Sequence, residues 1–396
     1  MSKLMRITLV LLAVIAVALT LAIKLRRSST AKVVKEDALV VHEWGTFTSI
    51  AGKDGVALEW RPLNGATDLP KFVHTIQDQS SGLRHPPGKG ELTAAIRMET
   101  PVLYFYSNRE MNVSARVDFP LGKITEWYPL ARTVSSGIDW GTVKVAPNAA
   151  FNLPADYSRN HYYAARETDA APVQICATNG KAAEQEKFLF YRGVGNFDLP
   201  LSVKLENGKV TVRSSAKEPI ARVIIFENQN GRIGFRTLDT FSGEVVTERP
   251  TLSEKVDSVI QQLRQTLVAA GLYEKEADAM IKTWRDNWFE EGMRVFYFLP
   301  QTITDSVLPL TINPKPAELV RVLVGRTEVI TPDMEKGVRA KVNLLSSSSP
   351  EVRDEARREI LKYGRFSEPI LKQLIEDEKD TAVRGRLQQL IKPPSS

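Results

Sequence analysis

Residues 201–215 read LSVKLENGKVTVRSS, and this stretch decides the class of fold. Apolar and polar residues alternate on both sides of Asn207-Gly208, a dipeptide that tolerates the positive φ angles of a tight type I′ turn. Residues 221–238, ARVIIFENQNGRIGFRTL, show the same arrangement around Asn228–Gly231. Both stretches therefore predict antiparallel β-hairpins.

Strand signals continue through residues 38–250. Short runs rich in β-branched and aromatic residues alternate there with turns, and no segment of helical period separates them. Consecutive strands without crossover helices favour an antiparallel β-sandwich over βαβ units. Strand character returns at 293–299 and 319–330, so we expect one β-rich domain over residues 38–331.

An α-hairpin is predicted at residues 251–292, inserted in this domain or capping it. The sequence Thr251-Leu-Ser-Glu254 has the form of a capping box that starts a helix, and Gly271 is expected to end that helix. A second amphipathic stretch covers residues 274–291. The apolar face of each stretch predicts that the hairpin lies on a sheet.

The segment 332–396 is predicted to be helical. Thr331-Pro332 and Ser349-Pro350 each place a capping hydroxyl ahead of a proline, an arrangement typical of a helix start. Val352-Arg353 recurs as Val383-Arg384, and the segment around them resembles HEAT-type helical repeats. The fold class expected for the whole chain is therefore α+β.

The N-terminus has the character of a membrane segment. Residues 7–23, ITLVLLAVIAVALTLAI, carry no charge and have basic residues on both sides. This predicts a signal-anchor helix within residues 1–30 and a polar tether at 31–37. A cleavable signal peptide is the alternative. An anchor would make the chain a single-pass protein of the bacterial cytoplasmic membrane, with its main domain extracytoplasmic.

The composition and net charge of the chain limit the classes of protein and of partner that can be expected. The 396 residues are 43% hydrophobic and 25% charged, which is typical of a globular chain, and the single Cys176 excludes an intramolecular disulfide framework. The net charge of +6 falls to +1 without the five basic residues of 1–30, a segment that has no acidic residue. We therefore expect no nucleic-acid partner.

Candidate catalytic residues are concentrated in the first half of the β-rich domain. All four histidines lie between residues 42 and 161, while the common hydrolase, metalloprotease and nucleotide-binding motifs are missing. His42 and Glu43 are neighbours on a strand and face opposite sides, so a partner for His42 has to come from elsewhere. The candidate catalytic set is His42, Glu99, Glu126 and His161.

Two kinds of chemistry remain open for this set. A histidine nitrogen within about 3 Å of a carboxylate would suit an extracytoplasmic hydrolase. Two histidines converging with a carboxylate would also suit a divalent metal, although no motif indicates one and no cofactor is identified. The simpler interpretation makes each histidine a core or surface group that bonds a loop carbonyl. Whether the chain is an enzyme stays open.

Candidate ligand-binding residues lie in aromatic surroundings. Arg166 follows Tyr162-Tyr163 and Arg192 follows Phe188–Tyr191, which suits stacking on a sugar or binding a carboxylate. The simpler alternative pairs such an arginine with a neighbouring acid such as Glu167. Trp60, Trp140 and Tyr157 are interpreted as loop residues that could present exposed rings to a glycan, whereas the same rings could equally belong to the core.

Several strings carry a resemblance to a known family: VHEWGTFTSIAGKDG, RMETPVLYFYS, ITEWYP, EKFLFYRGVGNF, WFEEGMRVFYFLP and VGRTEVITP. Together they resemble a family of bacterial envelope proteins with an HEWGTFTS signature and no established activity, over roughly residues 40–332. The resemblance implies an envelope location. That family has no assigned catalytic residues, so no residue role is carried over.

The leading hypothesis is a membrane-anchored, extracytoplasmic ligand-binding protein of the cell envelope, with a glycan as the ligand class to consider first. One alternative is an extracytoplasmic hydrolase that uses a histidine and carboxylate pair. Another is a scaffold that binds a protein partner through the helices at residues 350–391, which would require an exposed apolar strip on those helices.

Overall fold

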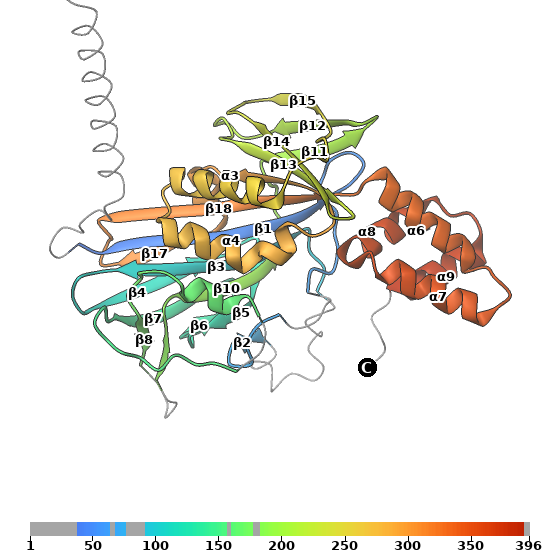
Figure 1. Cartoon of the computed structure of the whole chain (residues 1–396). Coiled ribbons are helices and arrows are strands. Elements are labelled where there is room, and N and C mark those ends of the chain that lie inside the picture. Colours follow the sequence, from blue (N-terminus) through green and yellow to red (C-terminus); the bar gives the residue numbers. More distant parts are fainter. Residues whose placement is uncertain (1–37, 64–67, 77–91, 157–159, 177–182, 392–396) are drawn as a thin grey trace, which may run out of the picture.

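A computed structural model describes residues 38–63, 68–76, 92–156, 160–176 and 183–391. It confirms the α+β class, with large β-sheets and most of the helices towards the C-terminus (Figure 1). The predicted membrane segment 7–23, the tether and Tyr157 lie outside the described residues. Among the described residues, no helix combines the length and the apolar composition needed to cross a bilayer.

The centre of the molecule is a nine-stranded sheet. In sheet order its strands are β14 (Arg232–Leu238), β13 (Val223–Gln229), β16 (Gly292–Phe298), β18 (Glu318–Val329), β1 (Val40–Ala51), β3 (Ile96–Tyr106), β10 (Leu189–Gly195), β5 (Gly122–Tyr128) and β2 (His74–Thr75). The pairing is antiparallel except between β1 and β18, which run parallel over their whole length. That parallel pair departs from the antiparallel arrangement expected from the sequence.

Two smaller sheets cover one face of the large sheet. One contains β17 (Leu310–Asn313), β4 (Met111–Asp118), β7 (Gly137–Val145), β8 (Val173–Ile175) and β9 (Glu184–Glu186), with β6 (Thr133–Val134) paired to β7. The other contains β11 (Leu201–Glu206), β12 (Lys209–Ser214) and β15 (Glu244–Glu248). Phe47 and Leu103 of the large sheet pack against Val143 and Val212 of the small ones in a single apolar core.

Both predicted hairpins form. Strands β11 and β12 meet across Asn207 and Gly208, which have φ values of 51° and 76°. Strands β13 and β14 meet across Asn230 and Gly231, with φ values of 52° and 79°. Positive φ at both central positions is what a type I′ turn requires.

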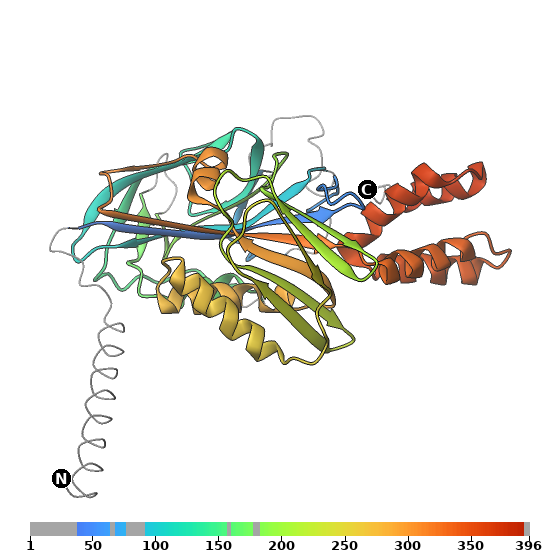
Figure 2. The same cartoon turned by 90° about the horizontal axis from the view of Figure 1, so that it is seen from above.

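The opposite, outer face of the large sheet is covered in part by an α-hairpin, as Figures 1 and 2 show. The hairpin consists of α3 (Val256–Ala269) and α4 (Glu274–Trp288), with the 3-10 helix η2 (Tyr162–Arg166) beside α4. The predicted start at Thr251 is wrong. The backbone N–H of Glu254 bonds to the carbonyl of Ile233 on β14, so the sheet edge uses the residues that the capping box would need.

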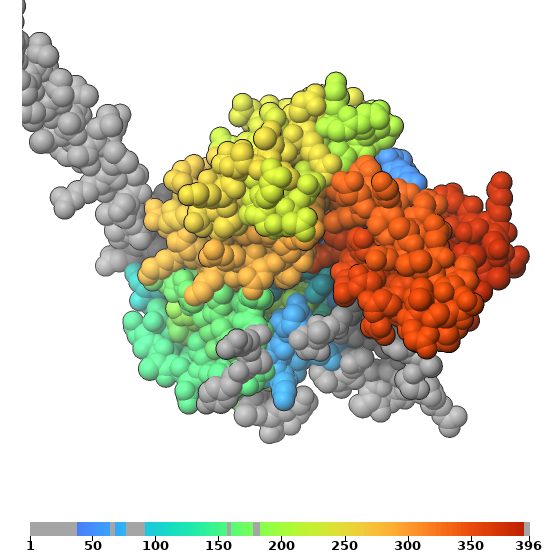
Figure 3. All heavy atoms as spheres, turned by 45° about the vertical axis from the view of Figure 1, so that its right-hand side comes forward, coloured from blue at the N-terminus to red at the C-terminus, as the bar shows by residue number. Residues whose placement is uncertain are grey.

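The remaining helices are α5 (Gln301–Val307) and the C-terminal group α6 (Pro332–Leu344), α7 (Pro350–Leu361), η3 (Gly364–Phe366), α8 (Ser367–Asp377) and α9 (Thr381–Ile391). Thr331 and Ser349 cap α6 and α7 through their hydroxyls, as predicted. The C-terminal group extends from one end of the large sheet (Figures 1 and 2) and forms the orange and red lobe of the surface in Figure 3. Ile50 and Trp60 join its apolar core.

Candidate functional site

A line of β-bulges crosses the large sheet. The register of β1 against β3 shifts between Trp44 and Thr46, and that of β3 against β10 shifts between Phe190 and Gly193. The pairing of β10 with β5 shifts directly after Arg192. Four neighbouring strands are therefore irregular at the same level. Bulges re-aim side chains and are common next to functional sites.

The backbone at these bulges is constrained. Thr100 on β3 has a φ of 45°, although a β-branched residue rarely adopts positive φ, and its buried hydroxyl has no hydrogen-bond partner among the described residues. A side chain at Gly193 would place its Cβ 2.4 Å from the carbonyl oxygen of Lys123. The irregularity is thus maintained by the local sequence.

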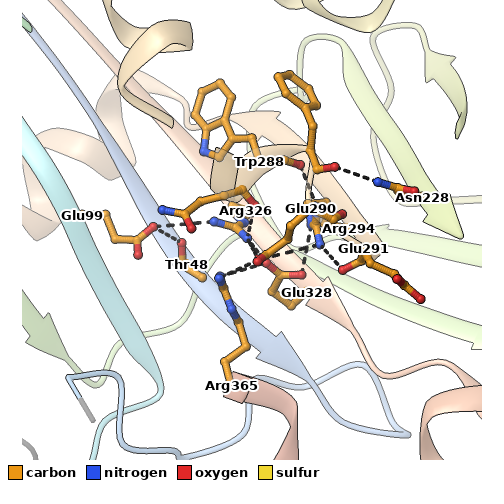
Figure 4. A network of polar contacts seen from close by, with 12 residues as sticks. Thr48, Glu99, Asn228, Trp288, Glu290, Glu291, Arg294, Arg326, Glu328 and Arg365 are labelled. Carbon is orange, nitrogen blue, oxygen red and sulfur yellow. Dashed lines mark hydrogen bonds and ion pairs between the residues drawn. The ribbon is translucent and has the colours of Figure 1, made fainter. Parts of the chain in front are cut away.

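Beyond the bulges the outer face changes from apolar to charged. Side chains two residues apart share a face of a strand, so Arg326 follows Val324 and Arg192 follows Phe190 on the same side of the sheet. We call the resulting cluster the charged band. It comprises Asp68, Arg97, Glu99, Glu126, Arg192, Glu290, Arg294, Arg326, Glu328 and Arg365. We call the part formed by Glu290, Arg294, Arg326, Glu328 and Arg365 its inner end, which Figure 4 shows.

Glu328 is the centre of the inner end. Its carboxylate contacts Arg326, lies 3.1 Å from Nε of Arg294 and lies 3.2 Å from Nη1 of Arg365. Burial raises the pKa of this carboxyl, but the three arginines outweigh burial and bring the pKa down to about 2. Since Arg365 belongs to η3, this cluster joins the sheet to the C-terminal helices.

Arg294 stabilises the end of α4. Its guanidinium donates to the carbonyls of Trp288 and Glu290 at 2.7 Å and to the carbonyl of Glu291 at 3.0 Å (Figure 4). The last carbonyls of a helix lack partners within the helix, and a cation is favourable there. The burial of Arg294 is therefore accounted for by its hydrogen bonds to the end of α4.

Arg326 is less completely paired. This fully buried guanidinium uses Nη2 to donate to the carbonyl of Asn287 at 2.8 Å and to Glu290 at 3.1 Å. Its Nε and Nη1 have no hydrogen-bond partner among the described residues, and the carboxylate of Glu99 lies 3.9 Å from Nη1. Burial, together with the charges of Arg365 and Arg294, lowers the pKa of Arg326 to about 10 despite the opposing effects of Glu328 and Glu99.

The outer end of the band consists of two arginines that share one carboxylate. Arg192 donates from Nη1 and Nη2 to the two oxygens of Asp68, at 2.8 and 3.1 Å. Nη2 of Arg97 lies 3.5 Å from the same carboxylate, and its Nε lies 3.2 Å from Glu99. Burial raises the pKa of Asp68, but Arg192 and Arg97 together hold it far below its usual value. The side chain of Arg192 is 2% exposed and that of Asp68 is 39% exposed.

His42 has a carboxylate partner that the sequence did not indicate. Its Nδ1 lies 2.8 Å from Glu276 of α4, which also accepts hydrogen bonds from the hydroxyl of Tyr106 at 2.8 Å and the backbone N–H of Tyr273 at 2.7 Å. His42 and Glu276 are both fully buried. The only local signal for Glu276 is its place in the first turn of a helix, where an acid bonds the preceding backbone.

The other predicted catalytic residues are not brought to His42. Glu99 and Glu126 belong to the charged band, where the hydroxyl of Thr48 donates to Glu99 at 2.7 Å. His161 lies at the surface, 3.4 Å from Asp286. Within the described ranges, no three His, Cys, Asp or Glu side chains are grouped so that they could hold a metal ion.

The exposed aromatic platform predicted for a glycan is wrong for the two tryptophans that are described. Trp60 is 4% exposed and packs with the C-terminal helices, and Trp140 is 2% exposed and lies within β7. Trp140 packs edge-on against Tyr191 and donates to the carbonyl of Pro129 at 3.2 Å. Both rings complete the core, because the surrounding strands and helices cover them.

Arg166 pairs with an acid other than the one expected. Its guanidinium contacts Glu186 at 2.6 Å rather than Glu167, and it lies 4.9 Å from the centre of the Tyr163 ring. Burial raises the pKa of Glu186, although its hydrogen bonds with Arg166 oppose that effect. The aromatic surroundings inferred from the sequence are therefore present, but the cation is already neutralised.

Two grooves lie away from the charged band. One of about 730 Å³ separates the end of β1 from the sheet of β11, β12 and β15, and Leu121, Phe197 and Arg213 line it. Another of about 650 Å³ lies between residues 53–59 and α8. On α7, Val352 and Leu361 are exposed, but nine residues of an α-helix place them on opposite sides rather than in one strip.

The sequence contains only an indirect signal for the charged band. Its strand residues are charged side chains two positions from apolar ones in otherwise buried strands, as in FLFYRGVG, GMRVFYF and VGRTEV. A buried charge is costly unless it is paired, so such residues predict a network. The sequence does not say which residues complete that network.

Comparisons with known proteins identify no family. No family model matches the chain, and no curated protein matches it. Among solved structures, the yeast delta-COP-I mu-homology domain is 9% identical with a TM-score of 0.28, covering 76% of this chain and 100% of that one. The same domain complexed with a Dsl1 WxWxV peptide is 8% identical with a TM-score of 0.28, covering 75% of this chain and 99% of that one. A likeness this low carries no argument about function.

Proposed function

We propose that this chain is a membrane-anchored, extracytoplasmic binding protein that takes up a polar, hydrogen-bond-accepting ligand at the charged band. The observation that carries the proposal is a group of guanidinium nitrogens within the charged band that have no hydrogen-bond partner among the described residues, namely Nε and Nη1 of Arg326, Nε of Arg192 and Nε of Arg97. A buried donor left unpaired costs about 1–3 kcal/mol, so native proteins rarely keep several together without a use for them.

The bulges and the strained Thr100 support the same site. They lie at the level where the outer face changes from apolar to charged, and Thr46 and Thr100 add two buried hydroxyls that have no partner among the described residues. Backbone strain of this kind persists where the surrounding structure enforces it, and it clusters at ligand sites. Guanidinium and hydroxyl groups together suit the oxygens of a glycan or another oxygen-rich molecule.

Residues 7–23 supply the proposed location. Their uncharged run between basic flanks would hold the chain in the cytoplasmic membrane, with the β-rich domain outside the cytosol. The test is fractionation of cells that produce the full-length chain. We expect it in the membrane fraction and, in intact spheroplasts, accessible to added protease. Recovery in the soluble cytosolic fraction would contradict the proposed location.

Binding is tested with the full-length chain in detergent micelles. The panel contains glucose, N-acetylglucosamine, glucuronate and inorganic phosphate, with calorimetry and thermal unfolding as the two measurements. We expect at least one of these ligands to bind, and Arg326→Lys to weaken its affinity by about tenfold, because lysine cannot reproduce the planar set of donors.

The matched control is Arg264→Lys, which alters an exposed arginine that pairs with Asp278 on the α-hairpin. This variant should leave the affinity unchanged. The proposed function is wrong if no member of the panel binds, or if Arg264→Lys and Arg326→Lys weaken binding equally.

A further inference from the structure

We propose that the ligand of the charged band carries a carboxylate, and that Asp68 occupies the place of that carboxylate in the free protein. This inference rests on the proposed function and specifies its ligand class. Arg97 and Arg192 would bind the ligand's carboxylate after Asp68 has left, so Asp68 competes with the ligand.

The contacts of Asp68 define the chemistry that the two arginines accept. Arg192 holds both carboxylate oxygens through the two ends of its guanidinium, which is the planar, bidentate arrangement that arginine forms with carboxylates. Oδ2 is also the oxygen that lies 3.5 Å from Nη2 of Arg97. Two arginines from the adjacent strands β3 and β10 thus converge on a single carboxylate.

The two sides of this contact differ in how firmly they are held. Arg192 is enclosed on a central strand, and Arg97 is 20% exposed on the strand beside it. Asp68 instead belongs to the connection between β1 and β2, outside the large sheet, and 39% of its side chain faces solvent. Exchange of the carboxylate therefore requires no movement of the sheet.

Local charge favours a carboxylate over a phosphate. Arg192 is hydrogen-bonded to Asp68 and lies opposite Glu126 on the neighbouring strand. Burial lowers the pKa of Arg192, but the charges of Asp68, Glu126 and Glu99 outweigh burial and raise it. A carboxylate that replaces Asp68 keeps the charge of the band unchanged. A phosphate dianion would add a further negative charge next to Glu99 and Glu126, which disfavours it.

The unused Nε of Arg192 extends the description of the ligand. Asp68 engages only Nη1 and Nη2, while Nε is buried and has no partner among the described residues. Nε points away from the fork formed by Nη1 and Nη2, so a second oxygen of the ligand that is remote from its carboxylate could accept a hydrogen bond from Nε–H. Glucuronate has such oxygens, since its ring hydroxyls are separated from its carboxylate by several carbons.

The experiment uses Asp68→Asn in the full-length chain, with glucuronate, glucose and inorganic phosphate as probes. Removing the internal carboxylate should tighten glucuronate binding by about tenfold and leave the affinity for glucose unchanged. Asp305→Asn is the matched control, because Asp305 is a half-exposed acid 2.7 Å from the buried Arg321 on the other face of the sheet. That variant should not alter glucuronate binding.

A second measurement is made on the wild-type chain, and a variant is needed only to assign the signal that is followed. The Nε–H signal of Arg192 in ¹⁵N-arginine-labelled protein, assigned by its loss in Arg192→Lys, should shift on titration with glucuronate, whereas that of Arg321 should not. The inference is overturned if this signal does not move, or if Asp68→Asn leaves glucuronate binding unchanged or tightens phosphate equally. Failure of these probes and of N-acetylglucosamine to bind would also remove the proposed function, whereas Arg326-dependent binding of glucose or phosphate without glucuronate binding would overturn only this inference.

Discussion

The two halves of the outer face of the large sheet use the same strands for different purposes. Under the α-hairpin, Trp44, Phe296 and Trp288 belong to a buried apolar layer. Beyond the bulges, the same strands carry Arg326, Glu328 and the rest of the charged band. Burial of apolar surface supplies stability, whereas buried ion pairs contribute little net stability because desolvation offsets their attraction. The comparison indicates that the apolar half maintains the fold, which is consistent with the ligand-binding role that we propose for the charged half.

The largest effect is expected in the apolar half. Trp288→Ala removes a fully buried ring that lies 5.2 Å from Phe296, centre to centre, and should reduce the free energy of unfolding by about 3–5 kcal/mol. Urea denaturation monitored by circular dichroism measures it. A loss below about 1 kcal/mol would show that the hairpin adds little to the core.

In the charged half, the free energy of unfolding should fall strongly only when one partner of a buried ion pair is removed. Glu328→Gln leaves Arg294, Arg326 and Arg365 without their shared carboxylate, and we expect a loss of about 3 kcal/mol in the same urea experiment. Glu355→Gln on α7 breaks an exposed pair with Arg358 and should cost less than about 0.5 kcal/mol. Equal losses in the two variants would remove the distinction between buried and exposed pairs.

Lowering the pH should reduce the stability contributed by the charged half, because its carboxylates have lowered pKa values. The pKa of Glu328 is lowered from 4.5 to about 2, so the folded state favours the ionised carboxylate, and its contribution to stability is lost as pH falls from about 4.5 to about 2. Asp68 and Glu99 have lowered pKa values as well and act in the same direction. The melting temperature of the wild type should fall over this range more steeply than that of Glu328→Gln. Parallel curves would show that Glu328 does not contribute.

A smaller loss than that of Glu328→Gln is expected at the boundary between the hairpin and the sheet. His42→Gln replaces the ring that contacts Glu276 and should reduce stability by about 1–2 kcal/mol while leaving a cooperative melt, since Tyr106 and the backbone of Tyr273 still bond that carboxylate. Hydrogen exchange of α4 should increase more than that of α7. Unchanged exchange in α4 would show that the contact does not hold the hairpin on the sheet.

The candidate site was predictable only in its components. The sequence indicated Arg192 as suited to stacking on a sugar, to binding a carboxylate or to pairing with an acid of the chain, and in the structure it holds the carboxylate of Asp68. Glu99 and Glu126 were placed with a histidine, yet they lie among arginines. The correct partner of His42 is 234 residues away, a distance along the chain over which no local pattern carries information.

The sequence by itself determined the features that depend on a few neighbouring residues. The hairpin turns at Asn207-Gly208 and Asn230-Gly231 and the helix starts at Thr331 and Ser349 follow from backbone preferences and capping within four positions. Only the tertiary structure decided the parallel pairing of β1 with β18, the burial of Trp60 and Trp140, and the meeting of Arg97 with Arg192. Those features depend on which distant strands pack together, because burial and charge pairing are properties of the assembled chain.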